Sequence, residues 1–269
     1  MLKLISWNVL QGGGYRLARQ VEVLGAKQVD VVALQEVTAK TAPLFRDALL
    51  RHGLAHVRHS FGIHRDHSLL RGSRRYGLLV ASRWPLRTLP PIAFHIPWPE
   101  RVLSVSILSP YGTIELHTTH IPTGAHRDWT RAETFEGIYR RLARRCAHPR
   151  ILCGDLNAPR EESPEGEVVT WGQRRKPNGD VVFEGGRGER SDRAERQVVT
   201  GLAPYGLIDV YRALHGYGRQ AESWHWRNRG RKGGYRLAAI LNLAQNRRFA
   251  MTLCEPTWRT GVLAFRFKL

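Results

Sequence analysis

Short apolar segments alternate along the chain with amphipathic segments of helical period, and this alternation limits the possible folds more than any other feature. Residues 29–35 (VDVVALQ) are apolar and short enough to form a buried strand. Residues 126–146 instead repeat apolar side chains at helical spacing, for example at Trp129, Phe135 and Leu142. Strands and helices that alternate in this way predict an α/β protein.

The alternation continues to the end of the chain without a repeat or a linker. We therefore expect one domain over residues 1–269. The polar segment 159–190 is rich in glycine and proline, which predicts a long surface loop. The expected strands cover residues 2–9, 29–35, 76–82, 101–108, 112–119, 149–153, 221–226, 234–241, 248–254 and 262–268.

The charge of the chain is strongly positive. Its 269 residues include 42 Lys and Arg against 23 Asp and Glu, which gives a formal net charge of +19. Such an excess favours polyanionic partners, because each neutralised phosphate releases counterions. We therefore expect a nucleic acid, DNA or RNA, as a partner. The alternative is that genome composition alone accounts for the many arginines.

The sequence also excludes several classes of protein. No apolar run reaches the roughly 18 residues of a membrane-spanning helix, and the first residues lack the cleavage site of a signal peptide. Cys146, Cys153 and Cys254 are too few for a disulfide scaffold and too scattered for a zinc site. We expect a reduced, cytoplasmic protein with no membrane partner.

Polar residues stand at the ends of several expected strands, where a buried strand would not use them for packing. They are Asn8, Glu36, His120, Asp155 and Asn157. Catalytic residues of layered α/β folds collect at strand ends, and carboxylates with amides suit a hard divalent cation. Taken singly, Asn8 could instead cap the glycine turn at 12–14, and Asp155 with Asn157 could form an Asx turn.

Seven segments of the chain together match one family pattern. They are SWNV, LQEV, YGLLVASRWPL, THIP, CGDLN, GLIDVYRALHG and SWHW, and they follow the family order over nearly the whole chain. In these segments the sequence resembles the endonuclease/exonuclease/phosphatase superfamily, which includes exodeoxyribonuclease III-like and pancreatic-type deoxyribonucleases. The resemblance implies a four-layer α/β sandwich, in which two mixed sheets pack face to face between helices.

The resemblance also implies roles for the residues at the strand ends. Glu36 would be the main ligand of Mg²⁺ or Mn²⁺, with Asn8 beside it. Asp155 would orient or deprotonate the attacking water, Asn157 would hold phosphate oxygens, and His120 would donate to the scissile phosphate. These roles meet the needs of phosphodiester hydrolysis for charge neutralisation, a positioned water and hydrogen-bond donors. The expected activity is divalent-metal-dependent hydrolysis of nucleic-acid phosphodiester bonds.

The C-terminal part departs from the family pattern. Members usually carry an Arg-hydrophobic-Asp-[His/Tyr]-Ile strand, and Ser-Asp-His before the closing strand. Here Ala238 and Ala239 occupy the Asp and His/Tyr positions, and residues 258–265 contain no Ser-Asp-His. Groups that act together retain little rate when part of the set is lost. We therefore expect weakened activity.

Two other functions remain possible from the sequence. The first is an inactive family member that binds nucleic acid without cutting it. The second is a phosphodiesterase for small molecules or lipid headgroups, which the absence of secretion and anchoring signals disfavours.

Aromatic and basic residues interleave near the C-terminus, at Trp226, Arg227, Arg229 and Arg231. This pattern could stack on and clamp an unpaired nucleotide, but a strand with one buried tryptophan and a basic turn explains it equally well. The histidines between residues 51 and 75 stand among arginines, whose charge opposes cation binding. We expect a solvated or phosphate-facing loop there.

Overall fold

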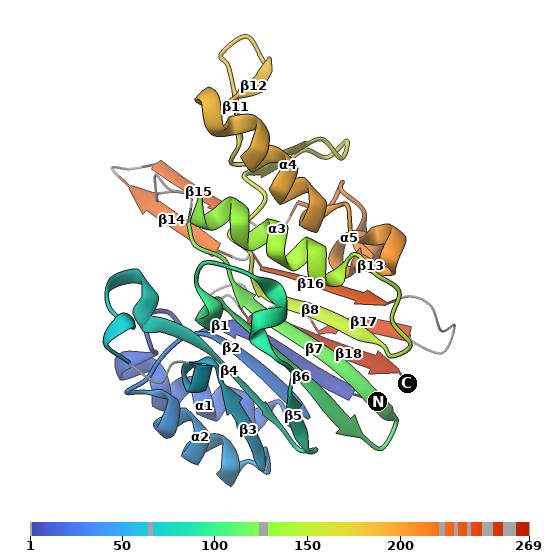
Figure 1. The fold of residues 1–269 in the computed structure, drawn as a ribbon. Helices are drawn as coiled ribbons and strands as arrows, with labels where there is room; N and C mark the ends of the chain where they lie inside the picture. The colour runs from blue at the N-terminus through green and yellow to red at the C-terminus, as the bar shows by residue number, and fades with distance from the viewer. Residues whose placement is uncertain are drawn as a thin grey trace.

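The computed structural model describes residues 2–63, 67–123, 129–220, 224–228, 231–235, 238–243, 250–254 and 262–268. Over these residues, two six-stranded sheets pack face to face, and helices cover their outer surfaces (Figure 1). Both sheets mix parallel and antiparallel pairs. The prediction of a four-layer α/β sandwich with two mixed sheets is therefore confirmed.

The first sheet contains the N-terminal strand. Its strands, in spatial order, are β17 (Ala250–Cys254), β18 (Val262–Lys268), β1 (Leu2–Asn8), β2 (Val31–Thr38), β4 (Tyr76–Ser82) and β3 (His56–His59). Among these strands β1 and β2 run parallel, and the other neighbours are antiparallel. A parallel pair needs a crossover connection, which contains helix α1 (Leu17–Ala26).

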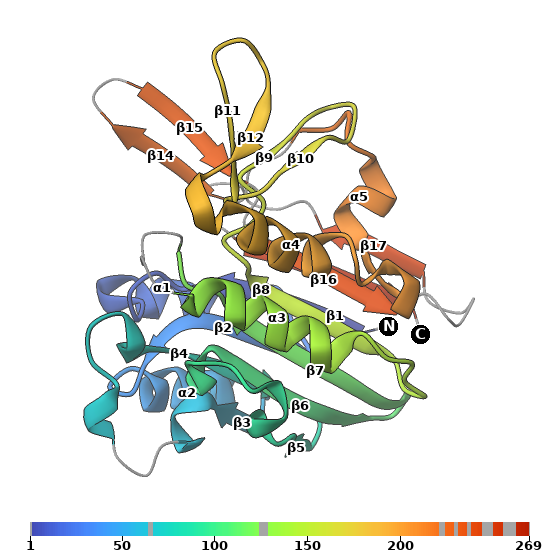
Figure 2. The same cartoon turned by 45° about the horizontal axis from the view of Figure 1, so that its top comes forward.

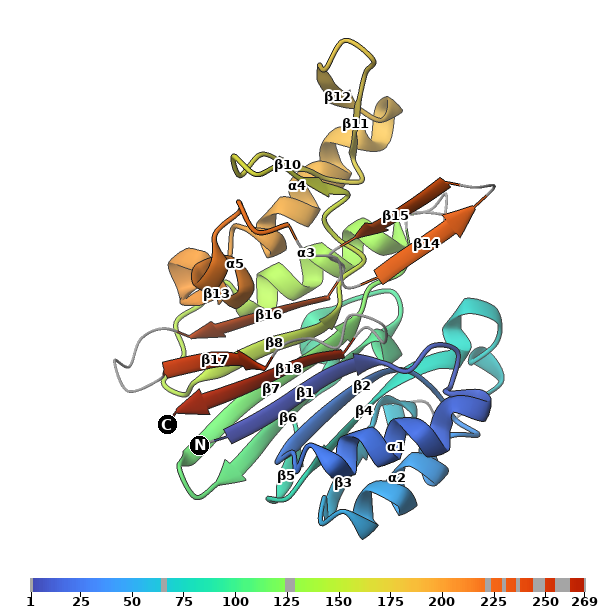
Figure 3. The same cartoon turned by 180° about the vertical axis from the view of Figure 1, so that it is seen from behind.

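The second sheet repeats this arrangement (Figure 3). Its strands, in spatial order, are β13 (Leu207–Asp209), β16 (Ala238–Leu243), β8 (Arg150–Asp155), β7 (Gly112–His120), β6 (Val102–Ser109) and β5 (Leu86–Thr88). Its parallel pair is β7 and β8, connected through α3 (Thr130–Leu142). Each parallel pair brings two carboxyl ends of strands to the same edge of its sheet.

Three apolar clusters fill the three interfaces between the four layers. One lies between the two sheets, one between the first sheet and helices α1 and α2 (Ala42–Arg51), and one between the second sheet and α3 and α4 (Gly188–Val199). A short helix, α5 (Val210–His215), follows β13. Of the helices in the described ranges, none combines the length and the apolar composition needed to cross a bilayer.

Strand β2 shows why the central strands are apolar on both faces. Val31 and Ala33 belong to the cluster between the two sheets, whereas Val32 and Leu34 belong to the cluster beneath the helices, together with Phe45 of α2. Successive side chains of a strand point to opposite faces. A strand with a sheet on one side and helices on the other is therefore apolar throughout.

Three antiparallel hairpins extend outside the two main sheets (Figure 2). They pair β9 (Glu161–Glu162) with β10 (Val168–Val169), β11 (Gln173–Arg175) with β12 (Val181–Phe183), and β14 (Trp224–Asn228) with β15 (Arg231–Tyr235). The first two occupy the segment expected to be a long loop. Strands of two or three residues are too short for an alternating pattern, so the sequence did not indicate them.

Short 3-10 turns lie in the remaining connections. They span Gly14–Arg16, Ser60–Ile63, His67–Leu69, Gly72–Arg75, Pro91–Phe94, Pro99–Arg101, Gly185–Arg187 and Ala203–Tyr205.

His117 of β7 is a titratable group buried in the second sheet. Its side chain is fully buried, and Nδ1 lies 2.8 Å from the Ser104 hydroxyl. Burial lowers the pKa of His117 below 6.5, and the neighbouring Glu115 carboxylate offsets only part of this effect. Protonation below pH 6.5 therefore favours the unfolded chain, where the pKa of the histidine is not lowered.

We expect the free energy of unfolding to depend on pH through His117. The contribution of His117 is fully present above pH 6.5 and is lost progressively as the pH falls below it, by up to about 1.4 kcal/mol per pH unit. Urea unfolding between pH 7.5 and 5.5 should show a shallower loss for His117→Gln than for the wild type. Exposed His148→Gln is the control. Equal slopes for the wild type and His117→Gln would contradict this expectation.

Candidate active site

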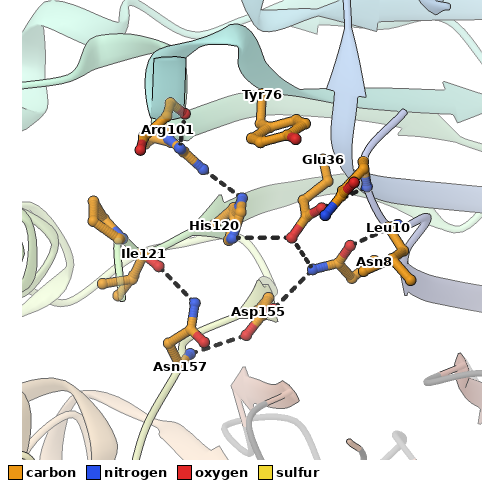
Figure 4. Close-up of polar contacts among 12 residues, drawn as sticks. Asn8, Leu10, Glu36, Tyr76, Arg101, His120, Ile121, Asp155 and Asn157 are labelled. Carbon is orange, nitrogen blue, oxygen red and sulfur yellow. Dashed lines mark hydrogen bonds and ion pairs between the residues drawn. The ribbon is translucent and has the colours of Figure 1, made fainter. Parts of the chain in front are cut away.

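The five polar residues predicted at strand ends lie together at one end of the sandwich (Figure 4). Strands β1 and β2 supply two of them from the first sheet, and β7 and β8 supply two from the second sheet. The fifth lies in the loop after β8. They are Asn8, Glu36, His120, Asp155 and Asn157.

The Asn8 side chain connects the two sheets at this end. Its Nδ2 donates to Glu36 Oε1 at 3.0 Å and to Asp155 Oδ2 at 2.8 Å. Its Oδ1 accepts from the backbone N–H of Leu10 at 2.9 Å, and this bond determines which end of the amide faces the carboxylates. An N–H₂ group between two carboxylates reduces their mutual repulsion.

Glu36 occupies a β-bulge in β2. The pairing of β2 with β4 shifts between Gln35 and Val37, and Glu36 has a left-handed φ of 60°. Such a conformation costs about 1–3 kcal/mol for a non-glycine residue. Hydrogen bonds hold it in place: Gln11 N donates to Glu36 Oε2 at 2.6 Å, and Gly12 N donates to the Glu36 carbonyl at 2.8 Å.

The loop after β1 provides these backbone donors. All five residues from 10 to 14 have positive φ angles between 51° and 79°. Glycine is required at Gly13, because its φ of 79° and ψ of −41° form a conformation that residues with a side chain rarely adopt, and a Cβ atom there would lie 3.1 Å from the Phe45 ring. The glycine run is thus a tight turn that brings amide groups to Glu36, in agreement with its interpretation as a turn.

Asp155 is held at the end of β8 by a close approach of two strands. Gly154 has φ 135°, and a Cβ atom there would lie 2.0 Å from the Thr119 carbonyl oxygen. Burial raises the pKa of Asp155 to about 6, although hydrogen bonds from Asn8 and from the Asn157 backbone lower it in part. A carboxyl group with a pKa near neutrality can accept a proton during catalysis.

Asn157 follows in a left-handed conformation with φ 48°. Its Nδ2 donates to the Ile121 carbonyl at 2.8 Å, and its own carbonyl accepts from Arg131 Nη2 at 2.8 Å. Arg131 also donates to the Pro122 carbonyl at 2.9 Å and pairs with Glu195 at 2.8 Å. The loops that leave β7 and β8 are therefore fixed to each other and to α4.

His120 lies between an arginine and Glu36. The Arg101 guanidinium contacts Nδ1, while Nε2 lies 3.6 Å from Glu36 Oε1. Burial, followed by the charge of Arg101, lowers the pKa of His120 well below 6.5. The neutral ring accepts at Nδ1 because Arg101 can only donate, so the proton is on Nε2 and faces the centre of the site.

The sequence did not indicate Arg101 as a site residue. The Arg101 side chain is 2% exposed and also donates to the Ser73 carbonyl, and burial lowers its pKa to about 10. Its position directly before β6, the strand that pairs with the end of β7, is the signal that could have identified it. Tyr76 lies beside Arg101 and Glu36 in the site (Figure 4).

The predicted nucleic-acid-binding residues lie in or next to the hairpin of β14 and β15. Trp226 and Arg227 belong to β14 and Arg231 begins β15. Arg229 lies outside the described residues. The hairpin extends from the same end of the molecule as the first turn of α3 (Figures 1 and 3).

The backbone register locates the positions where the family pattern is missing. Ala238 of β16 is paired directly with Asp155, and Ala239 is paired with Gly154. Strand β18 begins at Val262, opposite Trp7, one position before Asn8. The residues from 255 to 261 lie outside those described.

The donors at this site include two carboxylates, the ligand type that a hard divalent cation prefers. Glu36 and Asp155 are the carboxylates that Asn8 joins. The Asn8 oxygen is engaged by Leu10 N, so Asn8 lies beside Glu36 as expected but presents its N–H₂ group. In the described ranges, no group of three or more His, Cys, Asp or Glu side chains has the arrangement of a metal cluster.

Comparison with known proteins identifies the family. The Endonuclease/Exonuclease/phosphatase family profile matches residues 5–237. The chain therefore belongs to this family, as its sequence motifs suggested. No curated protein sequence matches the chain.

Several solved structures share the fold. An AP endonuclease from Archaeoglobus fulgidus has a TM-score of 0.65 and 19% identity, with 100% of both chains covered. A D. rerio TDP2 in complex with single-strand DNA product has a TM-score of 0.61 and 14% identity, with 98% of both chains covered. An endonuclease/exonuclease/phosphatase from Beutenbergia cavernae has a TM-score of 0.58 and 18% identity, with 99% of this chain and 71% of the other covered.

We expect Glu36 to be the carboxylate on which Mg²⁺ binding depends. With few charged ligands, the dissociation constant should be roughly millimolar. Titration calorimetry should detect this binding in the wild type and in the control Glu22→Gln, which changes an exposed carboxylate of α1, and should not detect it in Glu36→Gln. Micromolar Mg²⁺ binding that Glu36→Gln leaves unchanged would contradict the role of Glu36 as the main metal ligand.

Proposed function

We propose that the protein is a divalent-metal-dependent phosphodiesterase of nuclease type whose activity is weakened by an incomplete site. The observation that carries this proposal is the bridge from Asn8 to Glu36 and Asp155, which joins two carboxylates from different sheets at one end of the fold. The family, whose members include nucleases, supports the same reaction class.

Glu36 and Asp155 have different roles in the proposed hydrolysis. Glu36 holds Mg²⁺ or Mn²⁺, and the cation, when bound, neutralises charge on the phosphate. Asp155 accepts a proton from the water whose oxygen attacks phosphorus, as its pKa of about 6 allows. The bond from phosphorus to the leaving oxygen then breaks.

The remaining side chains act on the phosphate oxygens. His120 carries its proton on Nε2 and donates to the phosphate, Arg101 adds positive charge behind His120, and the Asn157 amide holds a further phosphate oxygen. Donors arranged in advance around a developing charge are the main source of rate in such reactions.

The missing groups explain why the activity should be weak. Ala238, in register with Asp155, has no carboxylate to offer to the cation side of the site. Ala239 likewise supplies no histidine or tyrosine, and the sequence before β18 holds no Ser-Asp-His. The site keeps Glu36, His120, Asp155 and Asn157 and lacks a further carboxylate for the cation and the Ser-Asp-His group for the phosphate.

Nucleic acid is the substrate that charge supports best. The formal charge of +19 favours a polyanion, and one similar structure is described as a complex with single-strand DNA product. In the β14–β15 hairpin Arg227 is paired in register with Lys232. Trp226 in the same hairpin would stack on a base.

The second candidate is a nucleic-acid-binding protein that has lost catalysis. The alanines at 238 and 239 favour it, because the retained basic residues could hold nucleic acid without cleavage. The two functions differ in one result, which is whether bound DNA or RNA is cut in Mg²⁺.

We expect Mg²⁺-dependent nuclease activity at least about a thousandfold below that of an intact relative. One lost phosphate-facing donor costs about 10²–10³ in rate, and the lost carboxylate adds to this. Plasmid cleavage with and without Mg²⁺, with an inositol phosphate as the alternative substrate, measures the activity. Robust cleavage that Asp155→Ala abolishes would show that another residue replaces the missing carboxylate and phosphate-facing donor.

Rebuilding the site should recover activity only when both missing segments return. Ala238→Asp with Ala239→His should remain weak, because the Ser-Asp-His before β18 is still absent. The same pair combined with a reinstated Ser-Asp-His segment should raise the cleavage rate, provided that β16 and β18 still pair. Full recovery of activity from Ala238→Asp with Ala239→His alone would contradict the expectation that both missing segments are needed.

If the charge serves nucleic-acid binding, affinity for duplex DNA should fall steeply with salt. Replacing Arg227, Arg229 and Arg231 by alanine should reduce the log–log slope by up to about three, since each phosphate contact contributes about 0.9. Replacing Arg140, Arg144 and Arg145, three exposed arginines around the far end of α3, is the charge-matched control. A wild-type slope near zero would leave genome composition as the explanation.

A further inference from the structure

Four polar residues from neighbouring strands are buried in the interface between the two sheets, where most of the side chains that the structure describes are apolar. They are Ser6, Gln35, Thr118 and Cys153, each at most 1% exposed. They come from β1, β2, β7 and β8 respectively, the four strands that also supply the side chains at the strand ends. We refer to these four residues as the buried polar layer.

The buried polar layer lies directly beneath the candidate active site. Three of its members come two positions before the site residue of their own strand, and Gln35 directly precedes Glu36. Side chains two positions apart on a strand share a face. Ser6, Thr118 and Cys153 therefore lie on the same inner faces as the site residues of their strands, about 7 Å deeper along the strands. The contact with Thr118 places the Gln35 side chain at the same depth.

Hydrogen bonds connect the members of the layer. Gln35 Nε2 shares its two protons among three acceptors, which are Ser6 Oγ at 3.1 Å, the Ala33 carbonyl at 3.0 Å and Thr118 Oγ1 at 3.1 Å. The contact with Thr118 joins the first sheet to the second. Burial raises the pKa of the Cys153 thiol to about 12, so the thiol stays protonated beside the Ser6 and Thr118 side chains.

Stability alone does not explain a polar layer in this place. Apolar side chains of the same shape would stabilise the interface about as well. The polar layer adds selectivity, because the hydrogen bond between Gln35 and Thr118 can form only in one alignment of the two sheets. Apolar contacts such as those of Leu4 and Leu116 in the same interface have no comparable directional requirement.

We propose that Gln35 and Thr118 are positioning residues, whose hydrogen bond sets the alignment of the two sheets and so of Glu36 and Asp155 about Asn8. The proposal rests on the phosphodiester hydrolysis proposed above. It requires no contact with substrate. A displacement of reacting groups by 1 Å can cost about a hundredfold in rate, so a small shift between the sheets has a large effect on kcat.

Thr118→Val tests the proposal, because valine keeps the shape and removes the acceptor. We expect kcat to fall about tenfold or more, with KM and the urea midpoint near the wild-type values. Thr118→Ser keeps the hydroxyl and should restore kcat to within about twofold. The matched control is Thr134→Val, which removes a fully buried hydroxyl that donates to Thr130 O within α3 at 2.6 Å, and should leave kcat unchanged.

Crystal structures of the same variants supply a measurement that does not depend on activity. In Thr118→Val the hydrogen bonds from Asn8 to Glu36 and Asp155 should be lost or lengthened, and in Thr134→Val they should persist. If Thr118→Val does not fold, Gln35→Met removes the same contact from the other sheet. Unchanged Asn8 geometry in the variant that folds, or an equal loss of kcat in Thr134→Val, would overturn the proposal.

A wild-type protein that hydrolyses no phosphodiester would refute the proposed function and not the positioning role. The Asn8 geometry of the variants would still decide whether the buried polar layer aligns the two sheets.

Discussion

The Asn8 amide is the contact on which the arrangement of the site depends, because it joins carboxylates that belong to different sheets. Without it, Glu36 and Asp155 would repel each other across the end of the sandwich. Its orientation is determined by Leu10 N, which occupies the amide oxygen and turns the N–H₂ group toward the carboxylates. The left-handed turn after β1 also holds Glu36 in position, because its amide groups are directed at this residue. Local backbone strain at the site is thus balanced by hydrogen bonds to one acidic centre.

The topology explains why four distant segments can meet there. Each sheet has a parallel pair, β1 with β2 and β7 with β8, and packing the sheets face to face brings the carboxyl ends of both pairs together. The two flanking strands β16 and β18 reach the same end, at Ala238 and Val262. A complete site of this family pattern would draw on six strands. Among the residues whose side chains the structure describes, β1, β2, β7 and β8 contribute polar groups, and the sequence of β16 has alanines at positions 238 and 239.

The sequence predicted the α/β class because short apolar strands and amphipathic helices are local patterns, and it predicted the four layers through its resemblance to the family. The five polar residues could be named because each stands where an apolar strand ends. The sequence did not predict the conformation of Glu36, because the apolar pattern of β2 does not indicate where a β-bulge occurs. The sequence did not predict a role for Arg101, because that role depends on its burial beside His120. The residues next to Arg101 in sequence do not distinguish it from the many other arginines. The polar layer around Gln35 was missed for a similar reason, because its members are isolated in sequence and meet only when the sheets pack.

We propose that Glu36 anchors a single cation at an incomplete phosphodiesterase site. Anomalous scattering from crystals soaked in Mn²⁺ would locate the ion without reference to activity. We expect one peak at the end of the sandwich within coordination distance of the Glu36 carboxylate, and no peak there in crystals of Glu36→Gln. A peak bound by other residues, or two peaks flanking Asp155, would contradict this proposal.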